Sequence, residues 1–256
     1  MRIVYAGGMT YLLKNSNNAY YDLNRQDSVS AEELTMIQSD YSQVAGRILT
    51  EEARIQAENA TMATTETGVK RYVAGANNLD IVVVSDFEGQ SINGHLVGGH
   101  CAPTAATTIV KYWANRRNVP NLYYYSDWWV FSSLYVNMNT CNINNLPNGP
   151  VNGTGAYSIM PGLINYSEQI RGVPTSGHDF IGDTTNETVT FDLIKTYITW
   201  EIPIIALQPG HAVCGFGYYT VDGRQQLIIA NGWTRAWTFQ NFSSLGIGQC
   251  FYVRWN

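Results

Sequence analysis

Three β-rich runs close the chain, and helical patterns come before them. The runs span residues 202–207, 212–219 and 226–230 and consist mostly of aliphatic and aromatic residues. The clearest helical pattern covers residues 102–116, where Pro103 suits the first turn of a helix. Because helices come first and a sheet second, the order favours an α+β fold over a doubly wound parallel sheet. Further helices are predicted at 127–138, 160–170 and 191–200, and further strands at 79–85 and 251–255.

The first 75 residues differ from the remainder. Ser30 and Glu33 have the spacing of a capping box, in which each side chain bonds the other's backbone N–H at a helix start. Apolar residues then recur at helical spacing, at Leu34, Ile37, Tyr41, Val44, Ile48 and Ile55. The pattern predicts a long amphipathic helix over 31–60, followed by a Thr-rich linker. We therefore expect an N-terminal helical segment at 1–75 and a main domain at 76–256.

Composition and charge exclude several classes of protein. Only 14% of the 256 residues are charged, and the formal net charge is −5. No Lys/Arg run is present, so no nucleic-acid partner is expected, because phosphate binding needs clustered cations. No apolar run reaches the roughly 18–20 residues of a membrane span, so no membrane partner is expected. No metal or other cofactor is expected either, because no His or Cys pair has ligand-like local spacing.

The neutral, hydrogen-bonding composition is also the basis for a prediction of location. Such surfaces are common outside the cell, so we expect a secreted or cell-surface monomer. The N-terminal stretch MRIVYAGGMTYLL does not have the features of a signal peptide, since Gly7 and Gly8 interrupt its short apolar part. A signal is therefore expected to lie upstream or to have been removed.

Four cysteines are scattered through the chain, at 101, 141, 214 and 250, without a CxxC pair. A Cys141–Cys250 disulfide is one pairing that the sequence permits. Cys101 lies where a glycine-bearing loop meets the predicted helix at 102–116. A thiol at a helix N-terminus faces unpaired backbone N–H groups and the positive end of the helix dipole, which lower its pKa below roughly 8.5. The alternative is that Cys101 is a small buried apolar residue.

His211 and Asn231 complete a candidate catalytic group with Cys101. His211 follows Pro-Gly at the start of one β-rich run, and Asn231 ends the next run. Adjacent antiparallel strands bring these two residues together, so that the Asn amide can fix the histidine tautomer. Trp233 can shield that hydrogen bond from water, whereas Cys214 points to the opposite face of its strand. The alternatives are a histidine bonded to a backbone carbonyl in the core and an Asn-Gly hairpin turn.

Three segments of the chain resemble a known family. GGHCAPTAATTIVKYW is similar to the Cys-Gly-Pro-Thr-Ala-Ala motif of peptidases related to the bacteriocin-processing group, within the papain-like superfamily. PIIALQPGHAVCGFGYY resembles their Gly-His-Ala-Val strand, and IIANGW resembles the Asn-x-Trp segment of papain relatives. The resemblance covers roughly residues 80–240 in the family's chain order. Ala102 replaces the usual Gly, Asn231 stands where many members have Asp, and no transporter or ATPase region is present.

The resemblance implies a papain-like fold and a cysteine peptidase with peptide or protein substrates. It implies a Cys101-His211-Asn231 triad and a glutamine that, with the Cys101 amide, binds the oxyanion. Gln90 is the best candidate for that glutamine, with Asn93 and His95 as alternatives. A catalytically silent peptide-binding module and a thiol acyltransferase are the alternative functions.

The resemblance also gives the N-terminal segment two interpretations. The helix predicted at 31–60 resembles the pro-segment of a papain-like zymogen, released by cleavage near Lys70-Arg71. The other interpretation is a permanent packing helix.

Overall fold

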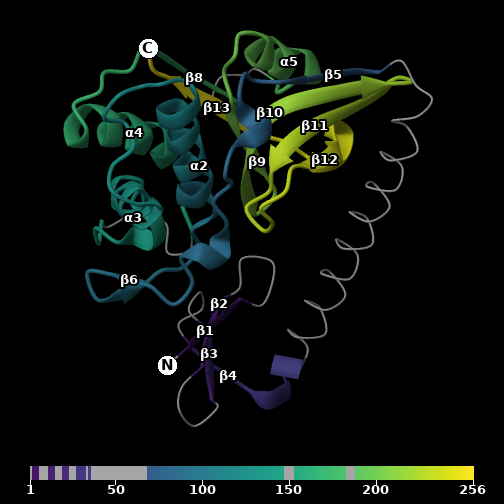
Figure 1. Ribbon diagram of the computed structural model, residues 1–256. Helices are drawn as coiled ribbons and strands as arrows, with labels where there is room; N and C mark the ends of the chain where they lie inside the picture. The colour runs from purple at the N-terminus through teal and green to yellow at the C-terminus, as the bar shows by residue number, and fades with distance from the viewer. Residues whose placement is uncertain are drawn as a thin grey trace.

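The computed structural model describes residues 2–5, 11–14, 19–22, 27–32, 34–35, 68–146, 153–182 and 188–256. Its main part combines helices with an antiparallel sheet, which confirms the predicted α+β class (Figure 1).

The main sheet has seven strands and is antiparallel throughout. The order is β12-β11-β10-β9-β13-β8, and β5 pairs with the second half of β10. The strands are β5 (Val69–Tyr72), β8 (Gly177–Ile181), β9 (Ile204–Gln208), β10 (His211–Val221), β11 (Arg224–Ala230), β12 (Thr238–Asn241) and β13 (Gln249–Arg254). The three predicted β-rich runs are β9, β10 and β11, and β10 lies between the other two. The ends of β10 and β11 can therefore meet at one rim of the sheet.

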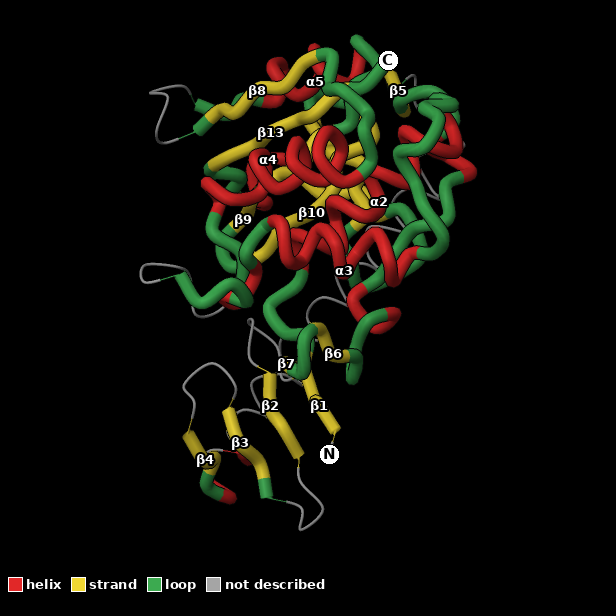
Figure 2. Tube along the Cα trace, turned by 90° about the vertical axis from the view of Figure 1, so that its left-hand side faces the viewer, coloured by secondary structure: helices red, strands yellow, loops and turns green. Residues whose placement is uncertain are grey.

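Helices α2, α3 and α4 lie together on one side of the strands (Figure 2). The helices are α2 (Cys101–Arg116), α3 (Asp127–Asn137), α4 (Ala156–Asn165), which continues as a π-helical turn (Tyr166–Ile170), α5 (Phe191–Thr199) and α6 (Phe242–Leu245). Short 3-10 turns occur at η1 (Ala76–Asn78), η2 (Val84–Asp86) and η3 (Thr140–Asn142). Hydroxyl side chains cap two helix starts, because Ser126 Oγ accepts from Trp129 N at 3.2 Å and Thr190 Oγ1 accepts from Leu193 N at 3.2 Å.

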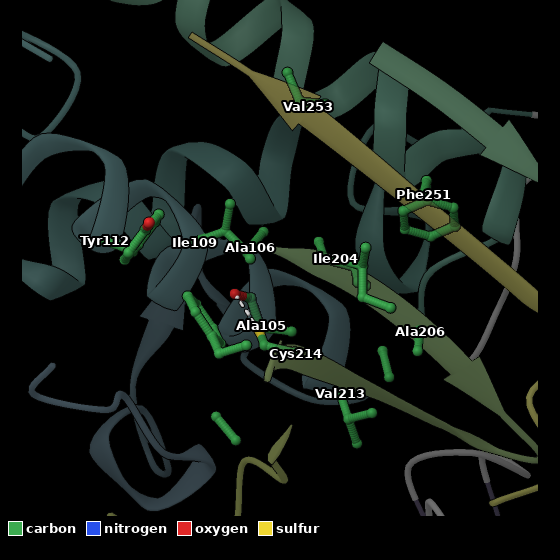
Figure 3. Packing of buried hydrophobic residues seen from close by; sticks show 14 of the residues in the cluster. Ala105, Ala106, Ile109, Tyr112, Ile204, Ala206, Val213, Cys214, Phe251 and Val253 are labelled. Carbon is green, nitrogen blue, oxygen red and sulfur yellow. Dashed lines mark hydrogen bonds between the residues drawn. The ribbon is translucent and has the colours of Figure 1, made fainter. Parts of the chain in front are cut away.

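The core forms where α2 packs on the sheet (Figure 3). Cys214 of β10 is fully buried, and its thiol donates a hydrogen bond to the Ala105 carbonyl of α2 at 2.9 Å. This agrees with the predicted core role of Cys214. Ala105 lies about one helical turn after Cys101, and Cys214 lies three residues after His211. This contact therefore sets the start of α2 and the start of β10 at the same end of the molecule.

The strand predicted at 79–85 is not formed. Residues 79–83 are irregular, and 84–86 form η2, although the apolar side chains of this segment are buried. The backbone N–H groups find other acceptors: Val82 N–H donates to Thr108 Oγ1 at 3.3 Å, and Val84 N–H donates to the Gly232 carbonyl at 2.8 Å. The prediction failed because a buried apolar run has the same sequence pattern as a strand, even when its partners are a helix and a turn.

The N-terminal residues form strands as well as a helix start. A four-stranded antiparallel sheet contains β1 (Arg2–Tyr5), β2 (Tyr11–Lys14), β3 (Tyr20–Asp22) and β4 (Asp27–Val29), which the prediction of a helical segment did not include. A helix begins after Ser30, with Leu34 N–H donating to the Ser30 carbonyl at 2.9 Å. The rest of the helix predicted over 31–60 lies outside the described residues.

Two further observations concern the organisation of the chain. β5 belongs to the main sheet, so that sheet begins before the predicted boundary between residues 75 and 76. Among the described helices, none is both long enough and apolar enough to cross a bilayer.

Candidate active site

Cys101 is the first residue of α2, and its side chain is buried. Its sulfur lies within hydrogen-bond reach of the Ala212 backbone N–H, next to His211. Burial raises the pKa of the thiol above its ordinary value, and the N–H groups of Ala212, Ala102 and Cys101 oppose this only in part. The sequence predicted a lowered pKa. That expectation is wrong because desolvation of the sulfur outweighs the effect of the helix terminus.

His211 begins β10, and its two ring nitrogens have different surroundings. Nε2 lies 2.7 Å from the backbone carbonyl oxygen of Asn231. Because a carbonyl only accepts, Nε2 carries the proton and Nδ1 of the neutral ring keeps its lone pair. Nδ1 is buried and has no hydrogen-bond partner among the described residues. Burial also lowers the pKa of His211, against a smaller effect of the Asn231 bond, so the ring is neutral near pH 7.

Asn231 acts on His211 through its main chain. Its side-chain Oδ1 accepts hydrogen bonds from Trp233 N at 2.8 Å and Thr234 N at 3.1 Å. These bonds shape residues 231–235, which we call the Asn231 turn. The sequence predicted that the amide side chain would orient the histidine. In the structure the amide oxygen bonds the turn, and the backbone carbonyl lies against His211. The orienting role of the amide stays a prediction.

Trp233, which the sequence predicted to shield the bond between His211 and Asn231, contacts His211. Its ring stacks on that of His211, with ring centroids 4.8 Å apart and an angle of 18° between the planes. Gly232, between Asn231 and Trp233, has a φ of +78°, and a Cβ there would approach His211 Cε1 to 3.9 Å. The structure thus brings His211, Asn231 and Trp233 into direct contact, and Cys101 lies beside the residue that follows His211.

The predicted oxyanion residues lie on a short hairpin before α2. Gln90 precedes β6 (Ser91–Ile92), and its carbonyl accepts from Val97 N at 3.0 Å. Asn93 is in the turn with a φ of +52°, and His95 begins β7 (His95–Leu96). All three side chains are exposed, and the choice among them stays a prediction.

His100, which precedes Cys101, was not singled out by sequence reasoning. It is fully buried next to Cys101, and its Nδ1 lies 3.1 Å from Thr104 Oγ1. Phe87 and Phe131 meet its ring edge-to-face, at centroid distances of 6.3 and 5.3 Å. Burial lowers the pKa of His100 to about 4, so the side chain before the thiol is neutral.

Cys141 supports the loop that leads into Cys101. Its thiol donates to the Gly98 carbonyl at 3.2 Å and accepts from Gly153 N at 3.4 Å. None of the four cysteines, all of them described, forms a disulfide, and Cys250 is buried in β13. The Cys141–Cys250 pairing that the sequence permitted is therefore not present.

The geometry agrees with a comparison against protein families. The Peptidase_C39 like family matches residues 78–251, about two thirds of the chain. The chain belongs to this family. C39-like proteins fall within the papain-like cysteine peptidase superfamily, and the matched segment contains Cys101, His211 and Asn231. A search of curated proteins gives no match. The strands β1–β5 lie before the segment that defines the C39-like match.

Among the described residues, no group of three His, Cys, Asp or Glu side chains is placed to hold a metal ion.

Proposed function

We propose that this protein is a cysteine peptidase that cleaves peptide bonds, with Cys101 as nucleophile, His211 as base and the Asn231 turn orienting the base. One observation carries the proposal. The Nε2–H bond from His211 to the Asn231 carbonyl leaves Nδ1 as a proton acceptor, at the end of β10 where the Cys101 sulfur lies against the Ala212 N–H. A nucleophile, a base and a group that orients the base are the parts of thiol acyl transfer.

The resting site holds a neutral thiol and a neutral imidazole, because burial disfavours the charged form of each. His211 Nδ1 takes the proton from Cys101 as the sulfur attacks the peptide carbonyl. The Asn231 carbonyl and the face of the Trp233 ring stabilise the imidazolium that forms. His211 then gives this proton to the leaving amine, and it activates a water molecule to hydrolyse the acyl-enzyme.

The negative charge that develops on the substrate's carbonyl oxygen needs hydrogen-bond donors close to it. The Cys101 backbone N–H, at the start of α2, is the first donor in the proposal. Gln90 supplies the second, with Asn93 and His95 as alternatives. A carboxamide that swings onto the oxyanion only when substrate is bound is compatible with an exposed position in the unliganded protein.

Within the superfamily, we place the protein nearest to the bacteriocin-processing peptidases, on its Cys-Ala-Pro-Thr-Ala-Ala and Gly-His-Ala-Val segments. Its substrate is a peptide or protein. We further propose a monomeric, secreted or cell-surface enzyme made as a zymogen.

The test of the activity is the Cys101→Ala variant. We expect hydrolysis of a peptide library to fall by at least about 10³-fold, because the nucleophile cannot be replaced by another group. The matched control is Cys250→Ala, which removes a thiol buried in β13 and leaves the site intact. Full activity in Cys101→Ala contradicts the proposal.

Labelling with iodoacetamide separates an enzyme from a silent binding module of the same fold. Stoichiometric alkylation of Cys101 in the wild-type protein, slowed in His211→Ala, supports the peptidase. An inert Cys101 in a protein without hydrolytic activity indicates the silent module.

A further inference from the structure

Residues 80–86, which we call the bridge segment, are bonded to the nucleophile helix. Lys111 of α2 is buried, and its Nζ lies 2.8 Å from Asp80 Oδ2. One turn earlier on the same helix, Thr108 Oγ1 accepts the hydrogen bond from Val82 N. An ion pair and a hydrogen bond therefore fix the bridge segment to the helix that begins with Cys101.

The other side of the bridge segment is bonded to the Asn231 turn. Val84 N–H donates to the Gly232 carbonyl at 2.8 Å. Arg235 makes the remaining contacts with its guanidinium group: Nη1 donates to the Ile81 carbonyl at 3.0 Å, and Nη2 pairs with Asp86 Oδ1. Arg235 Nη1 also lies 3.9 Å from Asp80 Oδ1. One side chain thus joins the turn that holds His211 to several points on the bridge segment.

Both carboxylate oxygens of Asp86 bind groups where the bridge segment meets the Asn231 turn. Its Oδ2 accepts from Val83 N at 2.9 Å while its Oδ1 pairs with Arg235. The carboxylate therefore sets the backbone of the bridge segment at the point where the guanidinium binds.

The contacts of Arg235 are better suited to positioning the Asn231 turn than to stabilising the fold. Its side chain is 54% exposed, and ion pairs of exposed side chains add little to the free energy of unfolding. A planar guanidinium, however, directs several N–H donors in fixed directions, which a lysine ammonium cannot do. Loss of the group should therefore loosen the turn without unfolding the protein.

We propose that Arg235 is a positioning residue for the reaction. It clamps the Asn231 turn, and with it His211, to the bridge segment and so to the helix of Cys101. This inference rests on the proposed peptidase function. It adds a requirement that the triad alone does not contain: the base and the nucleophile come from separate elements, and Arg235 fixes the distance between those elements. A small displacement of a catalytic group is enough to slow a reaction strongly.

The test compares Arg235→Ala with Arg71→Ala. Arg71 is a matched control, because its Nη2 also bonds one backbone carbonyl (Thr199, 3.1 Å) and one carboxylate (Glu201, 3.2 Å), but in β5. We expect Arg235→Ala to lower kcat on a peptide substrate at least tenfold, with KM and the melting temperature nearly unchanged. Arg71→Ala should keep the wild-type kcat.

Two further variants test the need for the guanidinium group. Arg235→Lys should recover only part of the lost kcat, since an ammonium cannot reach the Ile81 carbonyl and Asp86 together. Added ethylguanidinium should raise kcat of Arg235→Ala but leave His211→Ala inactive. Restoration of full kcat by lysine, or an absence of rescue, overturns the requirement for a guanidinium clamp.

The outcomes distinguish this inference from the proposed function. An unchanged kcat in Arg235→Ala, with Cys101→Ala inactive, overturns the clamp alone. A kcat that falls only together with the melting temperature also overturns it, because the effect is then structural. Wild-type protein that neither hydrolyses peptides nor is alkylated at Cys101 overturns the proposed function, and the clamp with it.

Discussion

At the scale of single residues, the carbonyl of Asn231 and its side chain have separate tasks. The carbonyl binds His211, and the side chain accepts from Trp233 N and Thr234 N. Asn231→Ala removes the two turn bonds, so we expect kcat to fall about tenfold, which corresponds to a barrier raised by roughly the net value of one hydrogen bond. Asn231→Asp keeps an acceptor oxygen for both bonds and should retain most of the activity. A loss in Asn231→Ala as large as in His211→Ala would show that the amide itself orients the ring.

Burial of the reacting pair predicts the pH profile. The neutral pair is the active form, so kcat/KM should rise with pH through the pKa of His211, which burial holds below 6.5. It should fall only as pH passes the pKa of Cys101, which burial holds above 9.0. The measurement is kcat/KM across the pH range, with alkylation of Cys101 followed in parallel. A thiolate already present below pH 6.5 contradicts the neutral resting pair.

His100 predicts how stability depends on pH. Its pKa is about 4 in the folded protein against an ordinary 6.5. As pH falls from 6.5 to 4, the unfolded chain binds a proton that the folded chain does not, so the free energy of unfolding decreases by about 3 kcal/mol. Urea unfolding at several pH values checks this. His100→Gln should flatten the dependence.

The sequence predicted the positions of these residues better than their chemistry. Cys101 and His211 could be found because each begins an element whose period is visible locally. The direction of the Cys101 pKa shift could not, since it depends on burial in the folded protein, where residues as distant in sequence as Ala212 lie near the sulfur. The role of the Asn231 main chain and the burial of His100 among Phe87 and Phe131 likewise depend on packing between distant segments.

At the scale of elements, close packing of the loop before α2 constrains the position of the nucleophile. Gly99 has a φ of +51°, and a Cβ there would lie 2.4 Å from the Gly153 backbone nitrogen. Gly99→Ala combines a strained backbone with a clash against main chain, so we expect it to destabilise the fold by about 2 kcal/mol or more. It should also displace Cys101 and lower kcat. Gly98→Ala is the control, because a Cβ at Gly98 meets nothing within 4 Å.

Elements with a clear local signal were predicted, and elements defined by their partners were not. α3 and α5 begin at hydroxyl caps that the sequence displays, and β9 to β11 are long apolar runs. β5, β8 and β12 are short and partly polar, and they are strands only because a neighbour in the sheet pairs with them. The segment at 79–85 shows the converse, since its apolar residues pair with a helix and a turn.

At the scale of the whole molecule, β5 restricts where an N-terminal segment can be removed. Cleavage near Lys70-Arg71 was the sequence prediction, yet both residues lie in β5, which pairs with β10 from Val69 to Tyr72. Lys70 Nζ lies 4.4 Å from the centre of the Phe239 ring. A protease needs an accessible, locally unfolded segment, and the pairing of β5 with β10 opposes that unfolding.

If the protein is a zymogen, as proposed, the cut that activates it should therefore fall before Val69 and leave β5 in the mature enzyme. Incubation of the purified protein, with mass spectrometry of the products, gives the new N-terminus directly. The Cys101→Ala variant is the control, because it should stay intact if the enzyme processes itself. A mature chain that starts at Tyr72 or later means that β5 is dispensable, whereas a stable full-length enzyme with full activity excludes a zymogen altogether.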